Sequence, residues 1–371
     1  MKIKKRIVIS STLKPVDDIR SFRKIGDSLG KTNNYDVKII GYGSKKTSTN
    51  NNIELISTGV FGRLSLKRIF LPFKILGIII KLKPDLLIIS THELLLSVFI
   101  IKVLNPSCKI VYDIRENYYA NIRFQKIFPP IIKHLLANWV RFKEVVTAPF
   151  ISHLLVAEMG YVQEIPFIKK RNHLVLENKS LYQGDRKSAN KDNLEKIIFT
   201  GNLSVNSGVL KAIEIYRQIK LHLPYTTLLI IGHCPDKNFR QKLQAIVTNE
   251  NDIVLKTDEE PISYQHIKSA IESADLAIVS YQINDSNINC IPTKVFEYLA
   301  HQLPFLCEKS SNWERIGKEV KMCFSYENDQ INVTEMIEWY RTITFTYPIN
   351  PFVWEEESQK LNDLVKKLIL E

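Results

Sequence analysis

The chain has 371 residues, which suits two domains better than one continuous hydrophobic core. Hydrophobic residues make up 45% of the sequence and charged residues 24%, a balance that excludes a largely disordered chain. The five cysteines are scattered, without a CxxC pair or a Cys/His cluster, so neither a disulfide framework nor a zinc site is expected. Reduced thiols in a cytoplasmic protein are the simplest interpretation.

The charge is distributed unevenly along the chain. Residues 1–180 contain 30 basic and 13 acidic side chains, a net charge of +17, whereas residues 181–371 contain 21 and 26, a net charge of −5. This asymmetry indicates an anionic partner for the first half, such as a membrane surface or an anionic substrate. A solvated basic surface is the alternative. Because no aromatic-basic recognition motif accompanies the charge, we do not expect nucleic acid to bind.

Neither a signal peptide nor a transmembrane helix is expected. The start of the sequence, MKIKKRIVISS, is basic and then apolar, but its apolar run is shorter than the roughly 7–15 residues of a signal-peptide core. A first β-strand explains it better. The longest apolar stretch, Ile69–Ile80, is interrupted by Pro72 and Lys74 and falls short of the roughly 20 residues that span a bilayer.

In the first half, short β-branched runs alternate with longer amphipathic stretches. The predicted strands are Arg6–Ser11, Tyr35–Gly41, Asp85–Ser90, Lys109–Ile114, Glu144–Ala148 and His173–Leu176. The predicted helices are Val16–Leu29, Arg63–Leu82, Leu94–Leu104 and Ile127–Arg141.

The polar stretch Asn178–Asn193 reads as an interdomain linker, after which the alternation restarts. The predicted strands are Lys196–Thr200, Thr226–Gly232, Asp252–Leu255, Asp275–Ser280 and Leu303–Cys307. The predicted helices are Leu210–Leu223, Asn238–Thr248, Tyr264–Ser273, Thr293–His301, Asn332–Thr342 and Val353–Leu370.

This alternation predicts an α/β protein with two Rossmann-like, doubly wound parallel-sheet domains facing a cleft. We expect an N-terminal domain over 1–180, a C-terminal domain over 194–352 and a closing helix over 353–371 that packs back toward the N-terminal domain. Ligands of such sheets bind beyond the carboxyl ends of the strands, where helix N-termini offer free amides.

The strongest candidate site is the helix start PTKVFEYLA, Pro292–Ala300. Pro292 suits the first position of a helix, and the amides of Thr293, Lys294 and Val295 are then expected to be free for a diphosphate. The Lys294 charge favours the same anion. Glu297, about one turn further along, suits hydrogen bonds to two ribose hydroxyls. The alternative is an ordinary amphipathic helix with a proline start and a surface glutamate.

With this motif the sequence resembles the retaining GT-B glycosyltransferases of the "glycosyl transferases group 1" family. The resemblance spans nearly the whole chain, through SSTLKPVDDIRSF, IVYDIRENYY, IIFTGNLSVNSG, PTKVFEYLAHQLP and WEEESQKLNDLV. It implies that the C-terminal domain binds a nucleotide-sugar and the N-terminal domain an acceptor. It also implies a diphosphate held without a metal ion or cofactor, and the histidines form no ligand-spaced set.

The sequence departs from the family pattern in two places. The family often has two acidic residues separated by seven others; Glu297 matches the second, but Asn289 stands at the first. The family also commonly places arginine and lysine in a glycine-rich loop, where this chain has Asn202 after Gly201 and Ser207 before Gly208. We therefore expect Lys294, with Arg20 or Arg115 of the facing domain, to stabilise the leaving diphosphate.

Candidates in the N-terminal half follow predicted strands. Arg115 stands where relatives often have histidine, and the acidic residue after it matches Glu116, a candidate for acceptor contact or proton handling; a helix-cap carboxylate is the alternative. His92 and Glu93 are further acceptor candidates. Asp17, Asp18 and Arg20 follow the first strand, with Asp17 equally suited to cap a helix.

Together with these residues, the resemblance implies a metal-independent glycosyltransferase that uses a nucleoside-diphosphate sugar and a glycan or lipid-linked acceptor in surface polysaccharide synthesis. The candidate catalytic residues are Glu116, Asn289 and Lys294. The basic first half and the apolar stretch Arg63–Leu82 indicate a peripheral protein at the inner face of the plasma membrane, although that stretch can equally be a core helix. A nucleotide-sugar epimerase of the same architecture and a non-catalytic GT-B scaffold are the alternatives.

Overall fold

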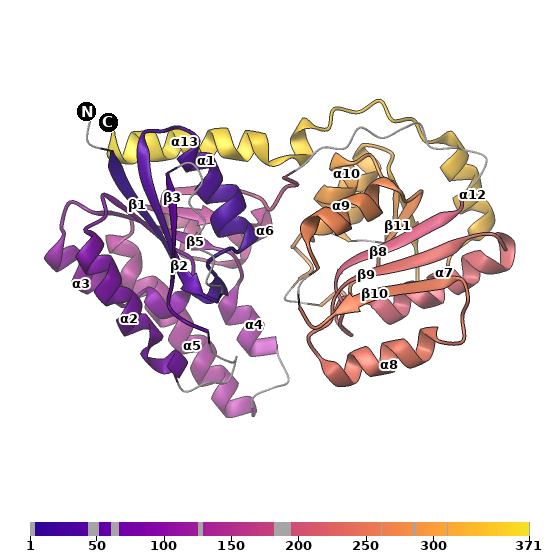
Figure 1. Ribbon diagram of the computed structural model, residues 1–371, viewed down its shortest axis with the longest axis horizontal. Helices are drawn as coiled ribbons and strands as arrows, with labels where there is room; N and C mark the ends of the chain where they lie inside the picture. Colours follow the sequence, from indigo (N-terminus) through magenta and orange to yellow (C-terminus); the bar gives the residue numbers. More distant parts are fainter. Residues whose placement is uncertain are drawn as a thin grey trace. The chain divides into compact units, whose positions relative to one another are not determined.

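The computed structural model describes residues 4–43, 52–60, 67–124, 129–181, 194–260, 262–284, 287–309 and 311–370 (Figure 1). The chain divides into two compact units, the first comprising Met1–Asn178 and Trp354–Glu371 and the second Lys179–Val353. Within the described ranges, no helix combines the length and the apolar character needed to cross a bilayer.

The first unit is built on a parallel sheet of seven strands in the order β3-β2-β1-β4-β5-β6-β7. Its central strands are continuous apolar runs, as expected for a sheet that helices cover on both faces; β4, for example, reads LLII and is buried throughout. The strands are β1 (Lys5–Pro15), β2 (Tyr35–Tyr42), β3 (Ile53–Ser57), β4 (Leu86–Ile89), β5 (Lys109–Ile114), β6 (His153–Val156) and β7 (His173–Val175).

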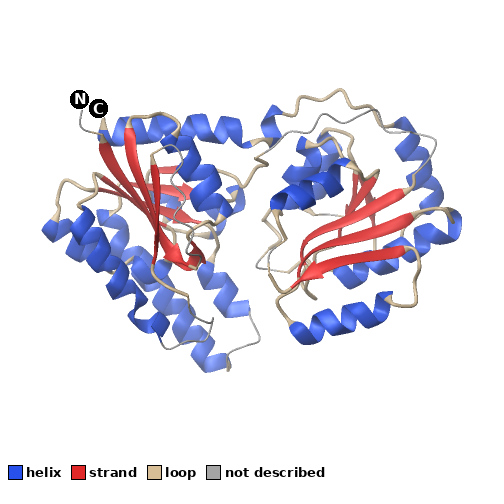
Figure 2. Ribbon diagram, viewed as in Figure 1, coloured by secondary structure: helices blue, strands red, loops and turns tan. Residues whose placement is uncertain are grey.

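Helices cover both faces of this sheet (Figure 2). Because parallel crossovers are right-handed, the helices after β3, β4 and β5 share one face, opposite the one that follows β1. The opposite face is covered by the π-helix η1 (Ile19–Gly26), α1 (Asp27–Gly30) and the last helix, α13 (Trp354–Ile369), which contacts both. The remaining helices are α2 (Lys67–Leu82), η2 (His92–Leu94), α3 (Ser97–Leu104), α4 (Tyr118–Phe124), α5 (Pro130–Thr147), η3 (Ala148–Phe150), α6 (Met159–Glu164) and η4 (Ile168–Lys170).

The second unit has a parallel sheet of six strands in the order β10-β9-β8-β11-β12-β13. The strands are β8 (Lys196–Asn202), β9 (Thr227–His233), β10 (Ile253–Asp258), β11 (Leu276–Val279), β12 (Phe305–Glu308) and β13 (Cys323–Tyr326). The helices are α7 (Val209–His222), α8 (Lys237–Val247), α9 (Tyr264–Glu272), α10 (Thr293–Ala300), α11 (Asn312–Glu319), α12 (Val333–Thr342) and η5 (Asn350–Phe352).

Both sheets reverse their strand order once, between β1 and β4 in the first unit and between β8 and β11 in the second. Such a reversal is the switch point at which doubly wound sheets bind ligands, beyond the carboxyl ends of the two strands. The predicted α/β class with two doubly wound parallel sheets is therefore confirmed.

One predicted strand is wrong. Glu144–Ala148 is not extended but completes α5 and begins η3. The run is rich in valine, which favours strands, yet Val140, Glu144 and Thr147 are buried at helical spacing, and Glu144 accepts hydrogen bonds from Tyr112 and Arg141. Tertiary contacts thus override local propensity, and the strand forms later, as β6. The short strands β3 and β13 were not predicted, and positions 182–193 of the predicted linker lie outside the described residues.

Candidate functional site

The switch point of the second unit is formed by the ends of β8 and β11. Ser280, directly after β11, donates a hydrogen bond from its hydroxyl to the carbonyl of Gly208 at 2.8 Å. A Cβ on Gly208 would lie only 1.6 Å from the Ser280 carbonyl oxygen, so the loop after β8 packs backbone against backbone here. Gly208 has φ +76° and Gly201 has φ +106°, values that glycine adopts without strain.

Helix α10 begins at this edge, after Pro292, which provides no side-chain cap. The amide of Val295 donates to the Pro292 carbonyl at 2.9 Å, so the prediction that Val295 offers a free amide is wrong. A helix start that tightens into an i→i+3 bond uses the third amide internally. Among the described residues, the amides of Thr293 and Lys294 have no hydrogen-bond partner.

The side chain of Lys294 turns inward from α10 and is 4% exposed. Its Nζ lies 3.9 Å from the ring centroid of Phe199 in β8 and 4.8 Å from that of Tyr281, which follows β11. A Cβ on Gly201 would lie 3.6 Å from Lys294 Cε. Nζ has no hydrogen-bond partner among the described residues. The ammonium group therefore lies at the switch point, over the faces of two aromatic rings.

Burial lowers the pKa of Lys294 to about 7, an effect that the nearby Glu297 carboxylate partly opposes. The aromatic faces attract the ammonium ion, but they do not replace the hydrogen bonds that water would make. An anion bound next to Nζ would favour the charged form of this lysine.

The next turn of α10 fixes the helix against β8. The hydroxyl of Tyr298 lies 2.8 Å from Thr200 Oγ1 and accepts a hydrogen bond from the Thr200 amide at 3.3 Å. Tyr298 is fully buried and follows Lys294 by one helical turn, so both side chains point to the same strand. Glu297, between them in sequence, is half-buried and stays near the Lys294 charge.

The other predicted donor residues differ in exposure. Asn202 is exposed at the end of β8, paired in register with His233, and Asn289 is exposed in the loop before α10. Ser207, which stands where the family commonly has lysine, is buried and closes a turn with Ser204, so it supports the loop.

Sequence reasoning did not single out Phe199 or Tyr281, which form the aromatic walls of the site. Phe199 belongs to an apolar strand and looks like an ordinary core residue. Tyr281 was recognisable in principle, because it directly follows a strand at the switch point. Burial raises the pKa of Tyr281 to about 12, and the Glu297 charge adds to that effect, so its hydroxyl stays protonated.

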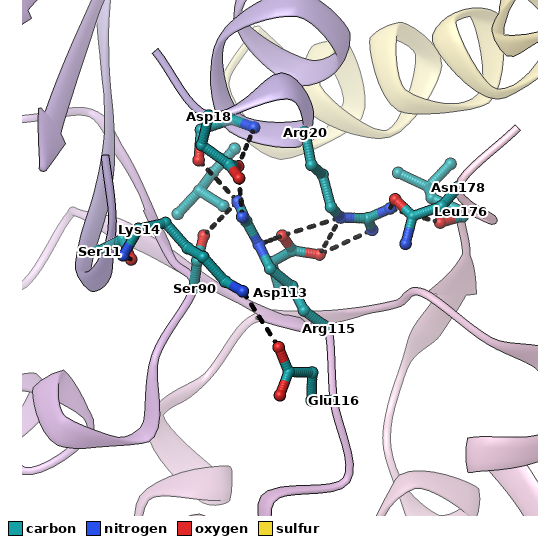
Figure 3. A network of polar contacts seen from close by, with 12 residues as sticks. Ser11, Lys14, Asp18, Arg20, Ser90, Asp113, Arg115, Glu116, Leu176 and Asn178 are labelled. Atoms are coloured by element: carbon teal, nitrogen blue, oxygen red, sulfur yellow. Dashed lines mark hydrogen bonds and ion pairs between the residues drawn. The ribbon is translucent and has the colours of Figure 1, made fainter. Parts of the chain in front are cut away.

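In the first unit, the predicted residues Asp18, Arg20 and Arg115 form a buried ion network around Asp113 (Figure 3). Arg20 donates from Nε and Nη2 to both Asp113 oxygens at 2.8–3.1 Å, and Arg115 donates from Nε to Oδ2 at 2.8 Å. Arg115 also donates to Asp18 at 2.6 Å.

Two carboxylates thus balance two guanidinium groups. Burial alone would raise the pKa of Asp113, but Arg20 and Arg115 outweigh it, and the pKa lies below its usual range. The pKa of Asp18 is lowered in the same way, mainly by Arg115 against the effect of burial. Since both arginines already have carboxylate partners, their contacts lend no support to the expected role at a diphosphate.

The caps of η1 and α4 are not the residues that the sequence suggested as helix caps. Asp18, not Asp17, caps η1 by accepting from the Ser21 amide at 3.0 Å. Asn117 accepts from the Ala120 amide at the start of α4, so Glu116 is not the cap there. Instead Glu116 pairs with Lys14 at 3.1 Å and remains partly exposed beside the network.

His92 and Glu93 lie in η2, at the carboxyl end of β4. Lys143 of α5 donates from Nζ to His92 Nδ1 at 2.9 Å, and the ring of Tyr118 packs edge-on against the imidazole at 4.9 Å. Burial, together with the Lys143 charge, lowers the pKa of His92 to about 3. The imidazole is therefore neutral at physiological pH, accepting at Nδ1 and carrying its proton on Nε2. Glu93 is half-buried beside it.

No three histidine, cysteine, aspartate or glutamate side chains gather as metal ligands would in the part of the chain that the structure describes.

Comparison with known protein families and with curated protein sequences found no match. Solved structures do match over the whole length. The sucrose-phosphate synthase of Thermosynechococcus elongatus superimposes with a TM-score of 0.69 at 12% identity, covering 98% of this chain and 99% of that one. The catalytic domain of Arabidopsis thaliana starch synthase IV, bound to ADP and acarbose, gives 0.66 at 10% identity, with 99% and 100% covered.

The chain has the GT-B fold. A Listeria monocytogenes protein named as a UDP-N-acetylglucosamine 2-epimerase also shares it, with a TM-score of 0.63 at 12% identity over 98% of this chain and 96% of that one. At such identities the likeness establishes the GT-B architecture and leaves the reaction to be argued from the site.

Proposed function

We propose that this protein is a glycosyltransferase that moves a sugar from a nucleoside-diphosphate donor to a glycan or lipid-linked acceptor. The observation that carries the proposal is the buried ammonium group of Lys294, which lacks a hydrogen-bond partner among the described residues and lies at the switch point of the second sheet. Burying a charge without a partner is unfavourable by several kcal/mol, so an anionic ligand is the natural complement of this site.

A diphosphate fits the groups that converge there. Lys294 supplies a positive charge, the amides of Thr293 and Lys294 point out of the helix start, and Gly201 lets the backbone of β8 come close. As the donor bond breaks, negative charge develops on the leaving diphosphate, and Lys294 stabilises it. No metal ion is required for this role.

Two polar residues complete the proposed donor site, one within α10 and one in the loop before it. Glu297 lies about one turn beyond Lys294, where its carboxylate can accept hydrogen bonds from two ribose hydroxyls. Asn289 contacts the donor sugar and, as an amide, brings hydrogen bonding without negative charge. A retaining reaction is proposed from the resemblance of this segment to retaining enzymes.

The acceptor is proposed to bind the first unit, where His92, Glu93 and Glu116 lie beyond the carboxyl ends of β4 and β5. Glu116 is partly exposed and is the candidate for proton handling, because the lowered pKa makes His92 a weak base. The basic character of this half suits an acceptor in surface polysaccharide synthesis on the cytoplasmic side of a membrane.

Two other functions fit specific observations. The absence of cations at Asn202 and Ser207, with an amide at Asn289, favours a GT-B protein that binds nucleotide without turnover. The shared fold of the Listeria protein allows an epimerase. Incubation with nucleotide-sugars separates the three. A transferase releases the nucleoside diphosphate and extends an acceptor, an epimerase converts the donor sugar without an acceptor, and a binding protein does neither.

The donor site is tested by thermal shift with UDP, GDP, ADP and CDP on the wild type, Glu297→Gln and the control Glu338→Gln, which changes an exposed glutamate of α12. One nucleotide should raise the melting temperature of the wild type and the control, with saturation at about 100 Kd worth about 2.7 kcal/mol. Glu297→Gln should reduce the shift. If no nucleotide stabilises the wild type, the proposed function fails; if Glu297→Gln responds like the control, the ribose contact fails.

A further inference from the structure

Large apolar side chains are exposed on three neighbouring helices of the first unit, α2, α3 and α5. The most exposed include Phe70 and Phe73 of α2, Val103 of α3, and Ile131, Leu135 and Trp139 of α5. We call these helices, with η3, the three-helix surface. Soluble surfaces normally carry scattered apolar residues, whereas a gathering of this size marks an interaction site.

Each helix is apolar on its outer side as well as its inner side. In α5, Ala137, Val140 and Thr147 face the core, while Ile131, Leu135, Trp139 and Phe142 recur at helical spacing on the opposite side. In α2, Leu71, Ile75 and Ile79 are buried, and Phe70 and Phe73 point outward. A helix that covers a sheet and faces water would be polar on its outer side.

The three helices lie on the same face of the sheet (Figure 1). Helix α2 contacts α3, and η3 contacts both α3 and α5. Phe99 of α3 packs edge-on against Phe150 of η3 at 5.1 Å, and Trp139 stacks on Phe142 at 5.5 Å. These contacts connect the helices that carry the exposed rings.

The charge of this surface has one sign. By sequence, α2, α3 and α5 carry eight lysines and arginines and one carboxylate, Glu144, which is buried and paired with Arg141 at 2.8 Å. The helices thus expose apolar groups and basic groups without an exposed acidic residue. A second copy of the chain binding through the same face would bring basic groups against basic groups.

We propose that the three-helix surface docks the first unit onto an anionic lipid bilayer. Its apolar side chains enter the boundary between headgroups and acyl chains, and its lysines and arginines contact lipid phosphates. Trp139 has the amphipathic ring that is favoured at this depth. The bilayer is complementary to both properties of the surface, its apolar area and its positive charge.

The same surface borders the proposed acceptor site. Helix η2, which carries His92 and Glu93, contacts α2 and α5. Lys143 of α5 lies over the Trp139 ring at 5.8 Å and donates to His92, so one side chain connects the surface with the candidate residue. If the proposed function holds, on which this step rests, the acceptor is a membrane lipid carrying a phosphate or sugar headgroup.

Vesicle flotation tests the docking surface on the full-length protein, without any nucleotide. The wild type should float with vesicles of phosphatidylcholine and phosphatidylglycerol, bind pure phosphatidylcholine at least about tenfold more weakly, and release at high salt. Phe73→Ser/Leu135→Ser, which changes residues 70% and 66% exposed, should reduce binding at least about tenfold. The control Leu221→Ser/Tyr225→Ser changes residues 84% and 89% exposed in the second unit and should bind like the wild type.

Two further experiments test the charge of the three-helix surface and the insertion of Trp139 into the bilayer. Lys133→Glu should weaken binding to anionic vesicles by about five- to tenfold, whereas Lys242→Glu on α8 should have no effect. Brominated lipids should quench tryptophan fluorescence of the wild type more than that of Trp139→Phe. Unchanged melting temperatures of all variants confirm that they fold.

The proposal is overturned if the wild type does not float with anionic vesicles at low salt, or if both double variants bind equally. It is also overturned if the wild type sediments as a dimer that Phe73→Ser/Leu135→Ser dissociates, because the partner is then a second copy. Vesicle binding without any nucleotide response would leave the docking surface in place and reject the glycosyltransferase, so the two proposals fail separately.

Discussion

The ammonium group of Lys294 lies between the rings of Phe199 and Tyr281, and burial lowers its pKa to about 7. An unfolded lysine has a pKa near 10.5, so between pH 7 and 10.5 the unfolded chain binds more protons than the native one. The contribution of Lys294 to the free energy of unfolding therefore becomes more favourable to the native state as the pH rises from 7 to 10.5. Below pH 7 Lys294 is charged in both states, and the free energy of unfolding is lowered by the full cost of burying that charge.

Lys294→Met removes this charge and keeps a side chain of similar length. We expect the melting temperature at pH 7 to rise by about 3–6 °C, because a neutral side chain replaces a buried ammonium ion. The nucleotide response should be lost in the same variant. The stabilisation should shrink as the pH of the measurement approaches 10.5.

The measurement is differential scanning calorimetry from pH 6 to pH 9.5, with Lys242→Met of the exposed face of α8 as the control. A variant that is less stable than the wild type at every pH would show that Lys294 already has a stabilising role without ligand, contrary to the account.

At this scale the sequence predicted that Lys294 stands at the start of a helix, which the structure confirms, but not the surroundings of its side chain. Lys294, Pro292 and Glu297 lie within six residues of one another, so their spacing can be recognised in the sequence. Phe199 lies in β8 and Tyr281 follows β11, both distant from Lys294 in the sequence, and the burial that lowers the pKa of Lys294 depends on them. The internal bond of the Val295 amide is likewise a detail of helix geometry that residue type does not specify.

At the scale of elements, Gly208 joins the loop after β8 to the end of β11. A Cβ there would lie 1.6 Å from the Ser280 carbonyl oxygen, and φ of +76° is strained for other residues. We expect Gly208→Ala to lower the free energy of unfolding of the second unit by roughly 2 kcal/mol or more, because backbone must move. Urea unfolding followed by circular dichroism measures this.

Gly77→Ala is the matched control, since a Cβ there meets no atom within 4 Å and the residue lies inside α2. It should stabilise the protein by about 0.5–1 kcal/mol through helix propensity. Equal effects of the two substitutions would contradict the close packing of the two loops.

The buried ion network of the first unit makes a second prediction at this scale. Asp113→Asn leaves Arg20 and Arg115 buried without their shared carboxylate and should cost about 3–5 kcal/mol. Because the pKa of Asp113 is lowered, the carboxylate stabilises the wild type above pH 4, and this contribution is lost as the pH falls through the lowered pKa.

Urea unfolding of Asp113→Asn against Asp17→Asn, which changes an exposed neighbour, provides the measurement at pH 7. A loss below about 1 kcal/mol would show that the network contributes no more than a surface ion pair. In that case the pairing with Asp113 would not prevent Arg20 and Arg115 from binding a ligand.

The elements themselves were largely predictable where their hydrophobic pattern is strong. β5 begins and ends at the predicted residues, and α10 differs from its prediction by one residue. The run Glu144–Ala148 failed because its valines favour a strand while its buried face belongs to α5. The outward apolar stripes of α3 and α5 were not recognised, because the sequence does not reveal which side of an apolar helix faces the sheet.

At the scale of the whole molecule, the proposed membrane-docking surface and the proposed diphosphate site lie in halves of the chain with different net charge. The basic half carries the three-helix surface, and the mildly acidic half carries Lys294 as a buried cation. The order of strands in each sheet follows from handedness rules once the alternation of strands and helices is known, which is why the fold class was predictable. Pairing of distant residues, such as Arg20 with Asp113, was not.

The central claim, that Lys294 receives the diphosphate of a nucleotide, is tested most directly by calorimetric titration. The nucleoside diphosphate that gives the largest thermal shift is compared with its own monophosphate, on the wild type and on Lys294→Met. The account predicts that the wild type binds the diphosphate at least about tenfold more tightly than the monophosphate, and that Lys294→Met removes this difference. An undiminished preference for the diphosphate in Lys294→Met would contradict it.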